Sequence, residues 1–129
     1  MIEEVHGSMR TRIDVLGTGA GLLEQDKESS CYVINRELMI DLGWCGVMRM
    51  PSQGIDPSAI QTLIITHTHA DHVLGLPQFL FFRFAGGLRA GDSLEVVGPR
   101  GVVEPVLDAA LAFLHAVTQS AGRNASAAS

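Results

Sequence analysis

The 129-residue sequence lacks several features that would define a functional class at once. It has no apolar run near the roughly 18 residues of a membrane span, and its first residues are acidic and polar, unlike a leader peptide. It has a single lysine, a formal net charge of −5 and a pI near 5.4. We therefore expect no membrane partner and no broad basic face for nucleic acid, so that an RNA substrate would have to be held locally.

Cysteine is also scarce. Cys31 and Cys45 do not form a C-x-x-C pair, and two such distant cysteines in a chain without a secretion signal are expected to be reduced thiols. A cytoplasmic location is the resulting expectation. With 47% hydrophobic and 18% charged residues, the chain has the composition of one globular domain.

The order of apolar patterns predicts an α/β fold. Alternating or apolar runs predict strands at residues 11–16, 31–34, 38–42, 62–66 and 94–97, the second and third forming a hairpin. Helical spacing predicts a capped turn at 56–60, a short helix or two broken ones within 71–84, and a helix at about 102–116. Residues 1–10 are expected to be an N-terminal extension, and residues 118–129, which have no core pattern, a disordered tail.

Three histidines and an aspartate lie within six residues, just after the strand predicted at 62–66. They are His67, His69, Asp71 and His72. Side chains two apart in an extended segment point the same way, so His67 and His69 can approach one ion while Asp71 and His72 face a second. The mixed nitrogen and oxygen donors indicate zinc first, with manganese or iron as alternatives.

Two ions that share a water can make it a bridging hydroxide nucleophile for hydrolysis. Asp71 is placed to ligate an ion and to accept the proton of that water, so we predict it to be the catalytic carboxylate. A lone histidine is more often an ordinary polar residue, but four such groups together favour a metal site over a polar loop that binds nothing.

The stretch His67-Thr68-His69-Ala70-Asp71-His72 resembles the H-x-H-x-D-H motif of the metallo-β-lactamase fold superfamily. Neighbouring segments agree with this resemblance over about residues 11–114. They are LGTG at 16–19, MIDLG at 39–43 and VGPRG at 97–101. The longer LGTGAG and the run GLP at 75–77 are most similar to the ribonuclease Z-like branch.

The resemblance implies an αββα sandwich hydrolase with two zinc ions, the first held by His67 and His69 and the second by Asp71 and His72. Asp41 matches the family's structural aspartate, which hydrogen-bonds the metal loop; the alternative is an ordinary turn residue at a strand end. A phosphodiester is the expected substrate, with thioester, lactam and sulfate ester chemistry left open. The glycines at 17–21 would be a nucleotide loop only in a weaker interpretation, because their spacing is G-x-G-x-G.

The resemblance also implies further ligands, a histidine, an aspartate and another histidine, from a second half of the fold. The remaining histidines, His6 and His115, lie in no such motif. Residues 11–117 are therefore expected to be the first half of the sandwich, truncated, with one apolar sheet face uncovered. A homodimer or a completing chain would then supply the rest, and the alternative function is a noncatalytic metal-binding fragment.

Overall fold

The structure, a computed structural model, describes residues 10–44, 46–84 and 92–128. Its centre is a five-stranded sheet in the order β1-β2-β3-β4-β5. The strands are β1 (Ile13–Gly17), β2 (Cys31–Ile34), β3 (Leu38–Ile40), β4 (Thr62–Ile64) and β5 (Glu95–Val97). β1 to β3 pair antiparallel and β3 to β5 pair parallel. The five predicted strands and the α/β class are confirmed.

The hairpin between β2 and β3 forms where the sequence predicts it. Asn35 and Arg36 have φ of 50° and 60°, and the Glu37 amide donates to the Ile34 carbonyl at 3.1 Å. Positive φ at two adjacent turn residues matches the right-handed twist of the flanking strands, and asparagine tolerates it best among residues other than glycine.

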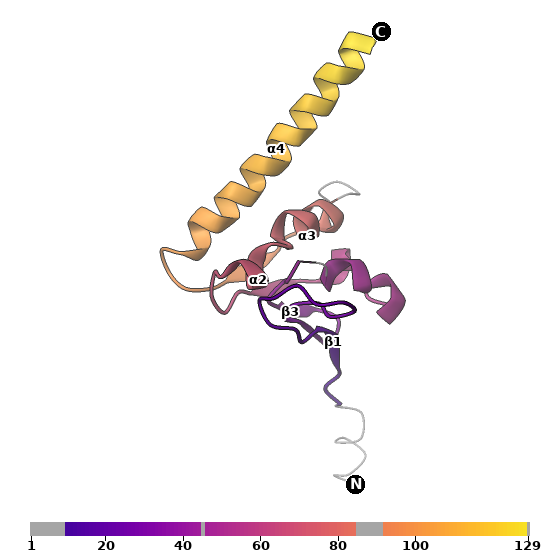
Figure 1. Ribbon diagram of the computed structural model, residues 1–129, viewed down its shortest axis with the longest axis vertical. Helices are drawn as coiled ribbons and strands as arrows, with labels where there is room; N and C mark the ends of the chain where they lie inside the picture. The colour runs from indigo at the N-terminus through magenta and orange to yellow at the C-terminus, as the bar shows by residue number, and fades with distance from the viewer. Residues whose placement is uncertain (1–9, 45, 85–91, 129) are drawn as a thin grey trace.

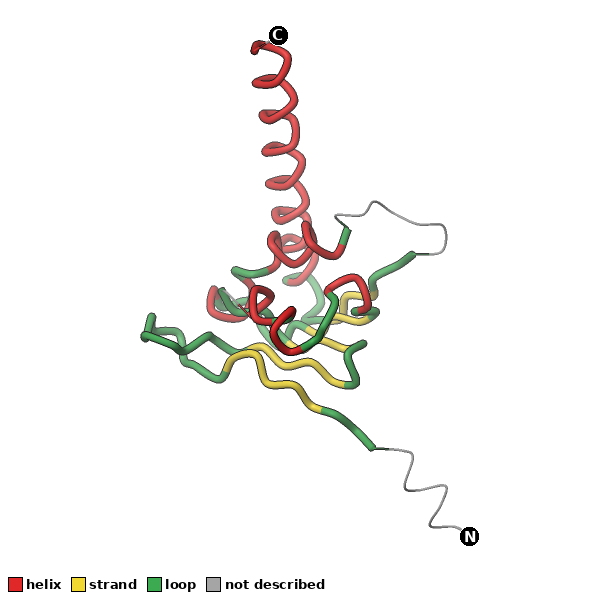
Figure 2. The backbone as a smooth tube through the Cα atoms, turned by 90° about the vertical axis from the view of Figure 1, so that its right-hand side faces the viewer, coloured by secondary structure: helices red, strands yellow, loops and turns green. Residues whose placement is uncertain are grey.

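Three helices lie on one side of the sheet, as Figures 1 and 2 show. They are α2 (Ala70–Val73), α3 (Leu76–Arg83) and α4 (Val103–Ala128). Short 3-10 helices precede them at η1 (Gly46–Arg49), η2 (Pro51–Gln53) and η3 (Pro57–Ala59). η3 confirms the predicted capped turn, because the Asp56 carboxylate accepts from the Ser58 amide at 2.9 Å.

The predicted helical region at 71–84 is divided in two, as its glycine and proline indicate. A Cβ on Gly75 would stand 2.4 Å from the Gly43 carbonyl oxygen, so the chain can pass there only as glycine. Pro77 then occupies the first turn of α3, where its missing amide donor costs nothing. The buried side chains of α3, among them Leu76 and Phe79, pack into the core.

The predicted end of the last helix near residue 116 was wrong, because α4 continues to Ala128. No proline follows Pro105, and the segment is rich in alanine, the best helix former, with Gly122 as its only strong helix opponent. Residues 118–120 are exposed, so no apolar pattern is required of them. Figure 1 shows this part of α4 extending away from the sheet.

The two faces of the sheet differ in their surroundings. Strand pairing places Asp14, Val33, Met39, Leu63 and Val96 on one face, the covered face, which packs toward the helices. The other face, the open face, carries Ile13, Val15, Tyr32, Ile34, Leu38, Ile40, Ile64 and Val97, together with Thr62 and Glu95. Ile13, Val15 and Val97 are 61%, 49% and 44% exposed, which confirms the predicted uncovered apolar face.

Some predictions lie outside the described residues. They concern residues 1–9 of the N-terminal extension with His6, and the Cys45 thiol. Within the described ranges, no helix is both long and apolar enough to cross a membrane.

Candidate metal centre

The predicted site residues meet at one edge of the sheet. β3, β4 and β5 are parallel, so their carboxyl ends lie together, and β3 leads into Asp41 while β4 leads into Thr66 and the histidines. β1 runs in the same direction and leads into the glycine loop at 17–21. Ligand sites in parallel sheets form at this edge, where the loops following several strands converge.

Asp41 organises the edge. Its Oδ1 accepts from the Thr66 amide at 2.8 Å, and its Oδ2 accepts from the Thr66 hydroxyl and faces His72 Nδ1, each at 2.7 Å. The residue is only 3% exposed, and its φ of 56° is in the left-handed region. Aspartate is one of the few residues that tolerate this conformation, and such strain is characteristic of functional sites. The structure thus gives Asp41 the hydrogen-bonding position that the resemblance implies.

The bond to Asp41 orients the His72 ring and leaves its Nε2 available to bind a metal ion. An ionised Asp41 can only accept, so His72 Nδ1 carries the proton and Nε2 carries the lone pair. That Nε2 lies 3.3 Å from Asp71 Oδ2. Two ligand atoms about 2.0–2.1 Å from a tetrahedral zinc ion stand about 3.3 Å apart. The donor pair His72 and Asp71 therefore fits one ion.

The His67 ring lies beside that of His72, and the His69 ring lies beside that of His67. The His67 ring centroid lies 4.0 Å from that of His72 and 4.7 Å from that of His69. Among the described residues, no three His, Cys, Asp or Glu side chains surround a common point as metal ligands would. The structure brings all four predicted ligands together, with the His67 and His69 rings edge to face.

Cys31 lies beneath the site and is not a candidate ligand. Burial, with a smaller contribution from the Asp41 carboxylate, raises the pKa of its thiol to about 12. Its side chain is fully buried in the hydrophobic core, whereas the predicted ligands lie at the edge of the sheet. The donors near the edge are therefore imidazole and carboxylate.

The glycine loop after β1 passes beside Asp71. A Cβ added at Gly21 would lie 3.4 Å from the Asp71 carboxylate, and one at Gly17 would overlap the Ser29 carbonyl oxygen. A nucleotide loop would open a helix, whereas the next element after this loop is β2. The nucleotide-loop alternative was wrong, and the loop's place is against the candidate metal centre.

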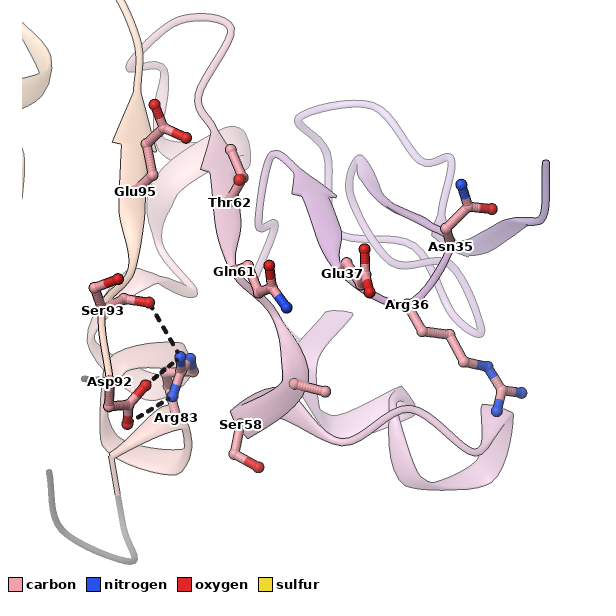
Figure 3. Close-up of a pocket in the computed structure, with 11 residues that line it drawn as sticks. Asn35, Arg36, Glu37, Ser58, Gln61, Thr62, Arg83, Asp92, Ser93 and Glu95 are labelled. Atoms are coloured by element: carbon pink, nitrogen blue, oxygen red, sulfur yellow. Dashed lines mark hydrogen bonds and ion pairs between the residues drawn. The ribbon is translucent and has the colours of Figure 1, made fainter. Parts of the chain in front are cut away.

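A polar cavity of about 770 Å³ lies at the opposite edge, among the amino ends of β3, β4 and β5. Figure 3 shows that its main charged group, Arg83, is already engaged. Its guanidinium donates to Asp92 at 2.8 and 3.3 Å and to the carbonyls of Ile60 and Ser93. Arg83 joins α3 to the sheet. His115 lies exposed on α4, outside the cluster.

Sequence reasoning did not single out Thr66. Its backbone and hydroxyl both bond to Asp41, and its hydroxyl oxygen lies 3.0 Å from His67 Nδ1. The available signal was its position, a hydroxyl residue at the strand end directly before the first histidine.

The fold identifies the class of protein. Human tRNase Z, short form (ELAC1), superposes with a TM-score of 0.71 and 24% identity, covering 82% of this chain and 41% of that protein. The metallo-β-lactamase fold protein YhfI from Bacillus subtilis gives a TM-score of 0.60 and 18% identity, covering 70% and 37%. The chain therefore has part of the metallo-β-lactamase fold.

Sequence comparison then gives the family. Residues 11–112 match the family described as Anti-Pycsar protein Apyc1, and the chain belongs to it. Ribonuclease Z of Exiguobacterium sibiricum is 36% identical over 92 residues, covering 69% of this chain and 30% of that protein. Ribonuclease Z of Streptococcus sanguinis is 34% identical over 102 residues, covering 74% and 33%. The chain spans about a third of the length of these curated relatives.

Proposed function

We propose that this chain is the metal-binding half of a phosphodiester hydrolase that uses two zinc ions. The observation that carries the proposal is the bond between His72 Nδ1 and Asp41, which turns His72 Nε2 to within 3.3 Å of Asp71. A buried carboxylate behind a histidine is the arrangement that fixes the ring of a metal ligand and raises its basicity. The hydrolase class of the relatives supports it.

Each predicted ligand has a role in this proposal. His67 and His69 would hold one ion, and Asp71 with His72 the other. Bound zinc would lower the pKa of a water toward ~7 and so supply a hydroxide nucleophile at neutral pH. Manganese or iron would suit the same donors less well.

Asp71 would also receive the proton of the attacking water. It lies in the first turn of α2, and its side chain is 20% exposed, so solvent reaches it. The backbone of Gly21 lies beside it, so that a Cβ at that position would stand 3.4 Å from its carboxylate. A carboxylate in this place can orient the water and take its proton.

RNA is the substrate named by the relatives, which are called ribonuclease Z. The net charge of −5 argues against broad electrostatic gripping of RNA, so a phosphodiester would be bound mainly at the metal centre. Thioester, lactam and sulfate ester substrates are the alternatives in the same superfamily. We keep the cytoplasmic location as part of this proposal.

The proposal includes a second sheet packed against the open face. Ile13, Val15 and Val97 on this face are exposed, and a second sheet packed face to face would bury them. A second copy or a completing chain would provide that sheet and further ligands. The second candidate function, a noncatalytic metal-binding half, is favoured by the absence of a three-donor group among the described residues.

The test combines metal content, solution mass and turnover. Zinc is measured by elemental analysis on the purified chain, and hydrolysis is measured with bis-p-nitrophenyl phosphate. We expect close to two zinc ions per chain in the form whose open face is packed against a second copy or a completing chain. His69→Ala should lose both zinc and turnover. His115→Ala is the matched control, because this histidine is exposed on α4 away from the cluster.

The alternatives give different results. Zinc binding without turnover, in the monomer and in any larger form, would establish the noncatalytic alternative. A folded chain that holds no zinc, or hydrolysis that survives His69→Ala, would refute the proposal.

A further inference from the structure

The Thr66 hydroxyl lies between two groups of the candidate metal centre. Its Oγ1 is 2.7 Å from Asp41 Oδ2 and 3.0 Å from His67 Nδ1. Asp41 Oδ2 in turn is 2.7 Å from His72 Nδ1. One carboxylate oxygen is thus linked directly to one histidine and, through a hydroxyl, to another.

Counting protons fixes the direction of each bond. The Asp41 carboxylate can only accept, so the single proton of the Thr66 hydroxyl is donated to it. The hydroxyl oxygen then has only lone pairs to offer His67, so His67 Nδ1 must be the donor. The proton of neutral His67 is therefore on Nδ1, and its Nε2 carries the lone pair.

We propose that Thr66 is a positioning residue that relays the hydrogen bond of Asp41 to His67 and fixes His67 as an Nε2 metal ligand. The zinc part of this inference rests on the proposed function; the tautomer part does not. Asp41, which is only 3% exposed, thereby sets the orientation of both His67 and His72. Partners behind a metal ligand typically change metal affinity by about 10–100-fold when removed. Thr66 itself lies exposed, where water competes, so the lower end of that range applies.

The direct test is the tautomer of His67 in zinc-free protein, read from the ¹⁵N shifts of its ring nitrogens by NMR at a pH where the ring is neutral. We expect a protonated Nδ1 in the wild type and a return toward the Nε2-protonated form, which free imidazole side chains favour in water, in Thr66→Val. His72 should keep its Nδ1 proton in Thr66→Val, because its bond to Asp41 does not pass through the hydroxyl. A wild-type His67 protonated on Nε2 would overturn the inference without any variant.

Zinc affinity, measured by competition with a chelator, is the second readout. We expect about tenfold weaker binding in Thr66→Val, recovery in Thr66→Ser, which restores the hydroxyl, and no change in Thr68→Val, two residues further on. Equal affinities for wild type and Thr66→Val would overturn the metal part of the inference. If no form binds zinc, the proposed function fails, while the tautomer experiment still decides the role of Thr66.

Discussion

The covered and open faces of the sheet carry similar side chains in opposite surroundings. Val33, Met39 and Leu63 on the covered face are fully buried, whereas Ile13 and Val15 on the open face are 61% and 49% exposed. A sheet with only one face against a core alternates apolar and polar residues, whereas a sheet covered on both faces is apolar on both. The comparison supports the proposal that these strands belong to a sandwich of which this chain provides one sheet.

The largest expected effect is a loss of stability when a buried side chain of the covered face is shortened. Met39→Ala should lower the free energy of unfolding by about 2–5 kcal/mol, because it leaves a cavity in the packed core. Ile40→Ala, the next residue but on the open face, should cost less than about 1 kcal/mol in the monomer. Urea denaturation at low protein concentration measures both. Equal losses would mean that the open face is not open in solution.

A smaller effect is expected where the covered face meets α3. Arg83→Met should lower the free energy of unfolding by about 2–3 kcal/mol, because Arg83 is 5% exposed and the change leaves Asp92 without its guanidinium partner. The double variant with Asp92→Asn should recover part of this loss. Zinc affinity should stay unchanged, since the carboxyl edge is untouched; a parallel loss of zinc would show that the two edges of the sheet are coupled.

The open face can be tested by adding charge. Val15→Lys should change the free energy of unfolding of the monomer by less than about 1 kcal/mol, since the side chain is already 49% exposed. It should nevertheless shift the solution mass toward the monomer, because a buried lysine at a sheet-to-sheet contact is costly. Light scattering measures the mass, and Leu23→Lys, in a loop residue 88% exposed, is the control. The same shift in both variants would remove the open face as the site of association.

The smallest effect concerns Asp14, the charged residue of the covered face. Hydrogen bonds from Arg12 at 2.9–3.1 Å hold the pKa of this carboxyl below its usual value, against the effect of burial. A depressed pKa stabilises the folded state above the unfolded pKa of about 3.9, and that stability is lost as pH falls through the folded value. Wild type should therefore melt higher than Asp14→Asn at pH 7, with the difference fading below about pH 4. A difference that persists at pH 2 would contradict this account.

Sequence patterns predicted most of the sheet because each strand is short, apolar and bounded by turn residues. The hairpin was predictable from Asn35 and its neighbours, and the division of the helical region from Gly75 and Pro77. The true extent of α4 was not, since an apolar pattern reports packing and this helix continues where it has little to pack against.

The metal-donor residues of the candidate site were predictable from the sequence, but the hydrogen bonds that orient them were not. The motif named His67, His69, Asp71 and His72, and the resemblance named Asp41. The relay through Thr66 depends on the meeting of two strand ends that are 25 residues apart, and its one sign in the sequence is a hydroxyl residue directly before the first histidine. The roles of these residues in binding zinc and in catalysis stay predictions.

The length of α4 also makes the separation of two associated copies measurable. Its 26 residues extend about 39 Å at 1.5 Å per residue, on the side of the sheet opposite the open face. Two molecules that met through their open faces would carry these helices on the outside of the pair, far from each other. Two that met through their helices would bring them into contact. The separation of spin labels at Val117 of each copy would therefore report which surface joins the two molecules.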